Sequence, residues 1–258
     1  MASLTPQRIV CLSAEAADWL WRIGAWERVV GVTAFFEMPA GASRKPRVSG
    51  FSTVRYQQIA DLNPDLVIAF SDVQAAPTTE LIRHGFTVLT TNQRTLPEIE
   101  TTLTLLGRIV DRQTEARTCL AEFRRRLTPV KDVNLRPRIY FEEWNAPLVS
   151  GISWISELIE RAGGQDIFPA LRREKAAAKR IVSSNLVRRK NPQLIFASWC
   201  GRPMKMDQIV SRSGWDKVEA VRNNRVYEIP GADILQPGFR IVYGYEQMRK
   251  AIVKTIGN

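Results

Sequence analysis

The sequence predicts an α/β fold made of two Rossmann-like lobes with parallel-rich central sheets, joined by one long α-helix. Three observations support this prediction: a pattern that occurs twice, an alternation of strands with helices in each half, and a continuous helical pattern between the halves. We therefore assign residues 1–95 to an N-terminal α/β lobe, residues 96–128 to the interlobe helix and residues 129–258 to a C-terminal α/β lobe.

The repeated pattern is clearest around two Asn-Pro pairs. Residues 63–69 (NPDLVIA) resemble residues 191–197 (NPQLIFA), and the two prolines are 128 positions apart. A helical pattern runs into each asparagine, and the following proline disfavours helical backbone there, so the helix ends. The apolar run after each pair is typical of a strand buried on both faces of a parallel sheet.

Each half also opens on a strand, continues with a short helix that ends at a glycine, and later returns to a β-rich run. These segments are 8–10, 17–24 and 87–89 in the first half, and 138–140, 155–163 and 225–229 in the second. Strands that alternate with helices in this way predict parallel pairing within each lobe.

The middle of the chain reads as one helix from about Leu96 to Leu127. Acidic side chains lie in its first turns and three arginines in its last turn, which complements the helix dipole. Apolar residues recur at helical spacing between them. At 1.5 Å per residue, about 30 residues would extend roughly 45 Å. We expect such a rod to span both lobes and to limit their relative motion.

The composition excludes several classes of protein. The net charge is +11, but the basic residues are scattered and no nucleic-acid reading motif occurs, so we do not expect nucleic-acid binding. Three widely spaced cysteines form no disulfide framework or metal pair. The single histidine, His84, argues against a His-rich zinc site and a Ser-His triad. No phosphate-binding loop is present.

A secretory leader has a basic stretch, then an apolar stretch, then small residues at a cleavage site. The first residues of this sequence do not show that order. This favours a cytoplasmic location, or a periplasmic one if a leader was removed. No apolar run approaches the roughly 20 residues needed to span a bilayer.

Candidate ligand-binding residues follow the predicted strands, because ligands of open α/β sheets bind beyond the carboxyl ends of the strands. With two lobes, those ends can face each other across a cleft. The residues expected there are Ser13, Phe35, Phe36, Phe70, Glu143, Trp144, Trp199 and Cys200. Their aromatic rings suit a planar or bulky ligand such as a macrocycle or a metal chelate. Arg240, with Arg202 and Lys205, could pair with an anionic ligand.

Each candidate also has a structural interpretation. For Trp144 and Trp199 we favour a position in the cleft, because each follows a predicted strand and lies beside small or polar residues. Glu142 and Glu143 could suggest acid–base chemistry, but neighbours on a strand end point in different directions, which favours one solvated and one structural carboxylate. Cys200 could be a metal ligand or a reactive thiol, although packing is the commoner role. An enzyme using these three residues is therefore the less favoured hypothesis.

The motifs at residues 8–13, 59–68, 155–164 and 214–227, in this order, resemble the class III periplasmic-binding-protein-like family, the solute-binding proteins of vitamin B12 and iron-chelate ABC transporters. The resemblance runs from residue 8 to about residue 252. It implies a non-enzymatic, monomeric protein that needs no cofactor and holds a small-molecule ligand for transport or salvage. In its B12-binding branch, aromatic residues after the strands hold the corrinoid. By position these are Phe35 or Phe36, Phe70, Trp144 and Trp199.

One departure from the branch concerns the membrane partner. B12 carriers present a glutamate on each lobe to an ABC permease, whereas the matching residues 73–76 and 234–237 contain none. A corrinoid binder that does not deliver to a permease fits this departure. A ferric siderophore or haem binder of the same fold is the alternative, and the positive net charge favours an anionic siderophore.

Overall fold

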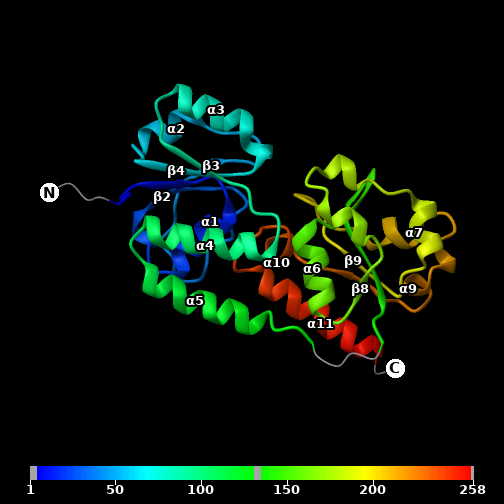
Figure 1. Cartoon of the computed structure of the whole chain (residues 1–258). Coiled ribbons are helices and arrows are strands. Elements are labelled where there is room, and N and C mark those ends of the chain that lie inside the picture. Colours follow the sequence, from blue (N-terminus) through cyan, green and yellow to red (C-terminus); the bar gives the residue numbers. More distant parts are fainter. Residues whose placement is uncertain (1–4, 131–134, 257–258) are drawn as a thin grey trace. The chain divides into compact units, whose positions relative to one another are not determined.

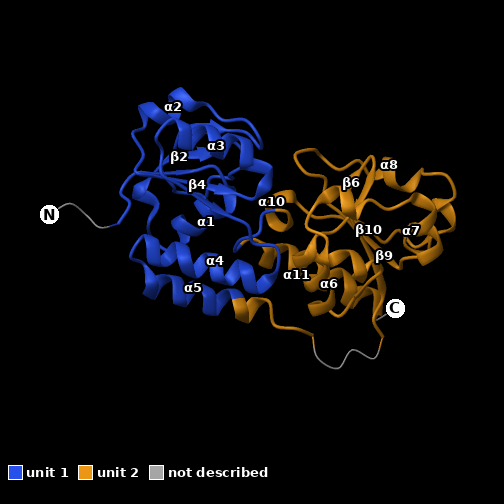
Figure 2. Ribbon diagram, turned by 45° about the horizontal axis from the view of Figure 1, so that its top comes forward, with its two compact units in different colours: residues 1–123, 236–239 blue, residues 124–235, 240–258 orange. Residues whose placement is uncertain are grey.

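A computed structural model of the chain describes residues 5–130 and 135–256 (Figure 1). The chain forms two compact units (Figure 2). Unit 1 consists of Met1–Phe123 and Gln236–Phe239, and unit 2 of Arg124–Leu235 and Arg240–Asn258. Among the described residues, no helix is both long and apolar enough to cross a membrane.

Unit 1 contains a parallel five-stranded sheet in the order β3-β2-β1-β4-β5. Its strands are β1 (Ile9–Cys11), β2 (Val29–Thr33), β3 (Arg47–Ser49), β4 (Leu66–Phe70) and β5 (Val88–Thr91). Its α-helices are α1 (Ala14–Arg22), α2 (Tyr56–Asp61), α3 (Ala75–Arg83), α4 (Leu96–Ile109) and α5 (Gln113–Arg126). The last three residues of α5 belong to unit 2. Two short 3-10 turns are η1 (Trp26–Arg28) and η2 (Asp72–Gln74). Aliphatic side chains of β1 and β4 pack with α2 and α3 in the core.

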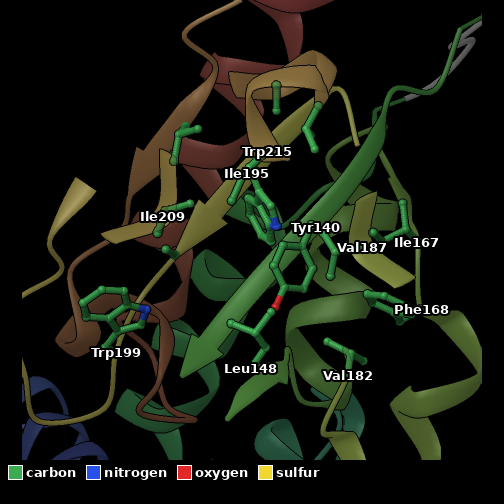
Figure 3. Close-up of a cluster of buried hydrophobic side chains, with 14 residues drawn as sticks. Tyr140, Leu148, Ile167, Phe168, Val182, Val187, Ile195, Trp199, Ile209 and Trp215 are labelled. Carbon is green, nitrogen blue, oxygen red and sulfur yellow. The ribbon is translucent and has the colours of Figure 1, made fainter. Parts of the chain in front are cut away.

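Unit 2 contains a sheet in the order β10-β9-β6-β7, with β8 paired to β6. Only the pairing of β6 with β7 is antiparallel among the described strands. The strands are β6 (Arg138–Asn145), β7 (Leu148–Ser150), β8 (Gln165–Asp166), β9 (Leu194–Ala197) and β10 (Val226–Glu228). The α-helices are α6 (Ser153–Arg161), α7 (Ser184–Lys190), α8 (Met206–Val210), α9 (Glu219–Arg222), α10 (Gly231–Ile234) and α11 (Ile241–Ile256). The 3-10 turns are η3 (Pro169–Arg173), η4 (Ala177–Arg180) and η5 (Trp215–Lys217). Figure 3 shows Tyr140 and Trp215 at the centre of its core.

The two Asn-Pro turns occur as predicted. Asn63 and Asn191 adopt left-handed backbone, with φ of 43° and 44°; Asn63 lies two residues after α2 and Asn191 directly after α7. Asparagine tolerates this conformation better than most residues, and the proline after it cannot continue the helix. β4 and β9 follow, and both are buried and paired in parallel. The duplicated α/β pattern of the sequence is therefore confirmed.

The prediction of one long interlobe helix is wrong. The helical pattern breaks at Asp111, whose φ is 52°, so α4 ends at Ile109 and α5 begins at Gln113. The two helices pack against each other after this turn. Their closeness is seen at Gly107, where an added Cβ atom would lie 2.5 Å from the Cβ atom of Ala116. α4, and α5 as far as Phe123, belong to unit 1, so residues 96–128 are not a separate connecting element.

We expect Gly107→Val to destabilise unit 1 by about 1–3 kcal/mol, because the added side chain overpacks the contact between α4 and α5. This outweighs the gain in helix propensity on replacing glycine. Urea denaturation measures the change, and Leu105→Val, at an exposed position of the same helix, serves as the control. Equal stability of both variants would show that α4 and α5 do not pack at Gly107.

A four-residue segment, Gln236–Phe239, completes unit 1 although the chain on both sides of it belongs to unit 2. The Gln93 side chain donates a hydrogen bond to the Pro237 carbonyl over 3.2 Å. The ring of Phe239 stacks on Trp19 with 6.5 Å between centroids and also contacts Phe123. The segment is therefore an integral part of the unit 1 core.

Candidate functional site

An exposed aromatic pair marks the carboxyl end of the sheet in unit 1. Phe35 follows β2 and Phe51 follows β3, and their rings meet edge to face with 6.1 Å between centroids. Phe35 is 41% exposed and Phe51 is 50% exposed. Two large adjacent rings left open to solvent are typical of a ligand-contacting surface.

The loop that carries Phe51 is held by Gln74. Its amide nitrogen donates to the carbonyls of Leu12 and Phe51, both over 3.1 Å, and its amide oxygen accepts from the Phe70 amide over 2.9 Å. Gln74 is buried, so these hydrogen bonds are protected from water. The segment that follows β4 thus holds the backbone of Phe51 in place through Gln74.

Phe70 also lies at this end of the sheet, where Arg94 covers it. The Arg94 guanidinium carbon is 5.3 Å from the centroid of the Phe70 ring, and one of its nitrogens donates to the Asp72 carboxylate over 2.6 Å. The arginine comes from the segment after β5. Phe70 therefore contributes a partly buried ring with a cation above it.

Ser13 and Glu15 lie buried at the start of α1, beyond the carboxyl end of β1. Burial raises the pKa of Glu15 to about 7, although its own backbone amide, the Ser13 hydroxyl and Arg94 each act to lower it. Gly238 packs directly on Glu15, since a Cβ atom added at that glycine would lie 2.6 Å from the Glu15 Cβ atom. The carboxyl group is thus enclosed by unit 1.

In unit 2, the predicted site residue Trp144 packs against the edge of the hydrophobic core. It lies near the end of β6 and is only partly buried. Its indole nitrogen donates to the Ala146 carbonyl over 2.9 Å, which fixes the ring, and the Arg202 guanidinium carbon lies 5.1 Å from its centroid. Trp144 and exposed Arg202 together present an aromatic and cationic surface.

Trp199 does not have the role predicted for it. It is only 5% exposed and belongs to the hydrophobic core of unit 2, where its indole nitrogen donates to the Glu142 carboxylate over 3.1 Å (Figure 3). A buried indole needs a hydrogen-bond acceptor, and Glu142 supplies it. Trp199 is therefore a core residue rather than a stacking surface.

The two neighbouring glutamates are both ion-paired, so the expectation that one is solvated is wrong. Glu142 is fully buried and accepts two hydrogen bonds from Arg212, over 2.5 and 2.8 Å. Glu143 accepts two from Arg180, over 2.7 and 3.0 Å, and one from the Ile152 amide. Such bidentate pairs hold the carboxylates in place, and their role is structural.

Three other predicted site residues, Phe36, Cys200 and Arg240, are wholly or partly buried, or paired with other residues of the protein. Phe36 is buried against Trp26, so Phe35 is the exposed member of that neighbouring pair. Burial raises the pKa of the Cys200 thiol, and nearby Glu143 raises it further, which disfavours a reactive thiolate. Arg240 donates to Asp233 over 2.6 Å. The described residues contain no group of three or more side chains suited to hold a metal ion.

The family model described as "Periplasmic binding protein" matches residues 9–232 of this sequence. The chain belongs to the periplasmic binding protein family. Its two-lobed α/β fold with parallel-rich sheets is that of the family's solved structures. The family is one of binding proteins.

Similar proteins carry bulky ligands. A vitamin B12-binding protein of Vibrio parahaemolyticus is 24% identical over 92% of this chain and 86% of its own length. The structure of the periplasmic vitamin B12-binding protein of Vibrio cholerae matches with a TM-score of 0.72 and 22% identity, over 97% of this chain and 98% of that chain. The periplasmic haem-binding protein of Roseiflexus matches with a TM-score of 0.81 and 16% identity, over 97% and 99%.

Three residues of the site were not predicted from the sequence. Phe51 follows β3, a three-residue strand too short to show alternation, and only the turn residues around it could have indicated a strand end. Arg94 follows β5, so the strand-end rule would have found it had it been applied to that strand. Gln74 lies in a short 3-10 turn and gives no sequence signal.

Proposed function

We propose that this chain is a solute-binding protein for a cobalamin-like corrinoid or another metal chelate, and that exposed aromatic side chains at the strand ends hold the ligand. The observation that carries the proposal is the exposed Phe35–Phe51 pair. Phe70, the last residue of β4 in unit 1, and Trp144, near the end of β6 in unit 2, also lie at strand ends. Each unit thus presents its own ligand-contacting surface.

The chemistry of these surfaces fits a large, flat and partly polar ligand. Aromatic rings give a wide apolar contact at a low cost in conformational entropy. Arg202 beside Trp144 adds a charged group that can pair with a phosphate or carboxylate of the ligand. The ligand is cargo rather than a cofactor.

A haem or a ferric siderophore is the second candidate. Arg202 and Lys205 are exposed close to β9 in unit 2 and suit a ligand with several carboxylates. A corrinoid carries mainly amide groups at its edge, so it would use the rings more than the cations. Titration of the purified protein with cyanocobalamin, haemin and a ferric siderophore, followed by visible absorption, separates these ligands.

We expect the double variant Phe35→Ala/Phe51→Ala to bind the preferred ligand about 10- to 100-fold more weakly, because aromatic contacts contribute about 0.5–1.5 kcal/mol each beyond their buried area. Isothermal titration calorimetry measures the change. Ile82→Ala, which truncates an exposed apolar residue on α3, is the control and should leave the affinity unchanged. Unchanged affinity of the double variant for all three ligands would refute the proposed surface.

A further inference from the structure

The net positive charge of the protein lies in unit 2. Unit 2 has 25 lysines and arginines against 13 aspartates and glutamates, a net charge of +12, whereas unit 1 has 12 against 13, a net charge of −1. The net charge of +11 is therefore carried entirely by unit 2. A charge of this size on a body of about half the chain creates a field that attracts anionic partners.

Many of these cations gather at the amino ends of the parallel strands β6, β9 and β10. The residues just before or at the starts of these strands are Arg136, Arg138, Arg188, Arg189, Lys190, Arg222 and Arg225, and we name this set the basic edge. Adjacent strands lie about 4.8 Å apart, so consecutive loops along one end of the sheet form one surface. This end is opposite the carboxyl end, where Trp144 lies.

Among the described residues, the basic edge has few counter-charges. Arg138 pairs with the partly buried Glu219 over 3.3 Å, and exposed Asp216 lies in η5, two residues after Gly214. Arg188 packs its guanidinium over Gly214, which fixes the end of α7 against the loop before η5. Within the described part of the chain, no carboxylate forms an ion pair with Arg188, Arg189 or Lys190, and all three are exposed. The edge thus presents several exposed cations together.

Exposed aliphatic side chains lie at the same end of unit 2. Leu135, 70% exposed, precedes β6, and exposed Val253 and Ile256 lie near the end of α11. The end of α11 lies beside the segment that enters β6 in both views (Figures 1 and 2). Lys250 and Lys254 flank these apolar residues. Apolar side chains among cations are typical of a protein face that rests on a bilayer.

We propose that the basic edge of unit 2 docks on an anionic phospholipid surface, with the sheet's ligand end directed away from the bilayer. Lysines and arginines would contact the lipid phosphates, and Leu135 with the end of α11 would enter the headgroup region. Nucleic acid is less favoured, since the exposed large apolar side chains described for unit 2 include no aromatic ring on which a base could stack.

The test is co-sedimentation of the full chain with vesicles of equal parts phosphatidylglycerol and phosphatidylcholine, compared with pure phosphatidylcholine. We expect binding to the anionic vesicles alone. It should weaken strongly when the ionic strength rises from about 0.1 M to about 1 M, because the Debye length falls from about 10 Å to about 3 Å. Equal binding to both vesicles, or no binding to either, would overturn the proposal.

A matched pair of variants separates the basic edge from net charge. Arg188→Glu/Arg189→Glu/Lys190→Glu should bind anionic vesicles about 100-fold more weakly or worse, given the contribution of each surface cation. Arg173→Glu/Lys175→Glu/Lys179→Glu changes the net charge equally, on exposed positions of the segment between β8 and α7, and should bind at least tenfold more tightly than the first variant. Circular dichroism verifies that both variants are folded.

Two results would contradict the proposal. If both triple variants lost binding equally, the attraction would depend on total charge and not on the basic edge. If a fluorescent DNA duplex bound more tightly than anionic vesicles at the same salt concentration, the partner would be a nucleic acid.

Discussion

Arg212→Met is expected to destabilise unit 2 by about 3–5 kcal/mol, because it leaves the Glu142 carboxylate buried without its partner. Glu142 is fully buried and accepts both of its charge-assisted hydrogen bonds from Arg212. Methionine matches the arginine stem as far as Nε, so the packing of the stem is kept and the guanidinium, which also contacts the Trp215 ring, is lost. Urea denaturation followed by tryptophan fluorescence measures the free energy of unfolding.

Two further variants define the cause of this loss. In Glu142→Gln/Arg212→Met the buried charge is gone, while the glutamine oxygen still accepts from Trp199, so at least half of the stability should return. Arg172→Met breaks the exposed pair with Glu160 and should cost no more than about 1 kcal/mol. A single-variant loss as small as that of Arg172→Met would show that the Glu142–Arg212 pair is hydrated in solution.

Glu15→Gln is expected to stabilise unit 1 at pH 8 and to have little effect or the opposite sign at pH 5. The pKa of Glu15 is raised from 4.5 to about 7 in the folded protein, so folding favours the protonated form. This contribution is fully present below pH 4.5 and is lost as the pH rises through about 7. Above that pH the ionised carboxylate costs on the order of 3 kcal/mol, which glutamine avoids.

Urea titrations of the wild type and of Glu15→Gln between pH 5 and about pH 8 measure this dependence. The difference in unfolding free energy between the two proteins should change over the window from pH 4.5 to about 7. Leu105→Val, at an exposed position of the same unit that does not ionise, is the control and should show no such change. A pH-independent difference for Glu15→Gln would show that the carboxyl group titrates as it does in the unfolded chain.

The parts of the fold that could be predicted are those with a local cause. The two Asn-Pro pairs end α2 and α7 because proline restricts the residue before it, and the apolar runs after them are buried strands. The break at Asp111 could not be predicted in this way. Asp111 and Arg112 lie between two segments with helical periodicity, and the packing of Gly107 on Ala116 across the turn is a tertiary contact without a periodic signal.

The candidate site was predicted in part, for a related reason. The strand-end rule indicates which residues lie at the carboxyl end of a sheet, and it correctly placed Phe35 and Trp144 there. It does not indicate which rings are exposed. Trp199 follows β9 as predicted but turns into the core, because Glu142 and Arg212, distant in the sequence, provide its hydrogen-bonded surroundings. Such long-range polar contacts leave no periodic signal.

The segment Gln236–Phe239 has a consequence for how the protein matures during synthesis. Unit 1 needs Phe239 against Trp19, so it is expected to finish packing only after residue 239 has left the ribosome. A truncated chain ending near residue 130 would expose those aromatic rings and is expected to aggregate. A cut between the two units is therefore expected not to yield unit 1 as an autonomous module.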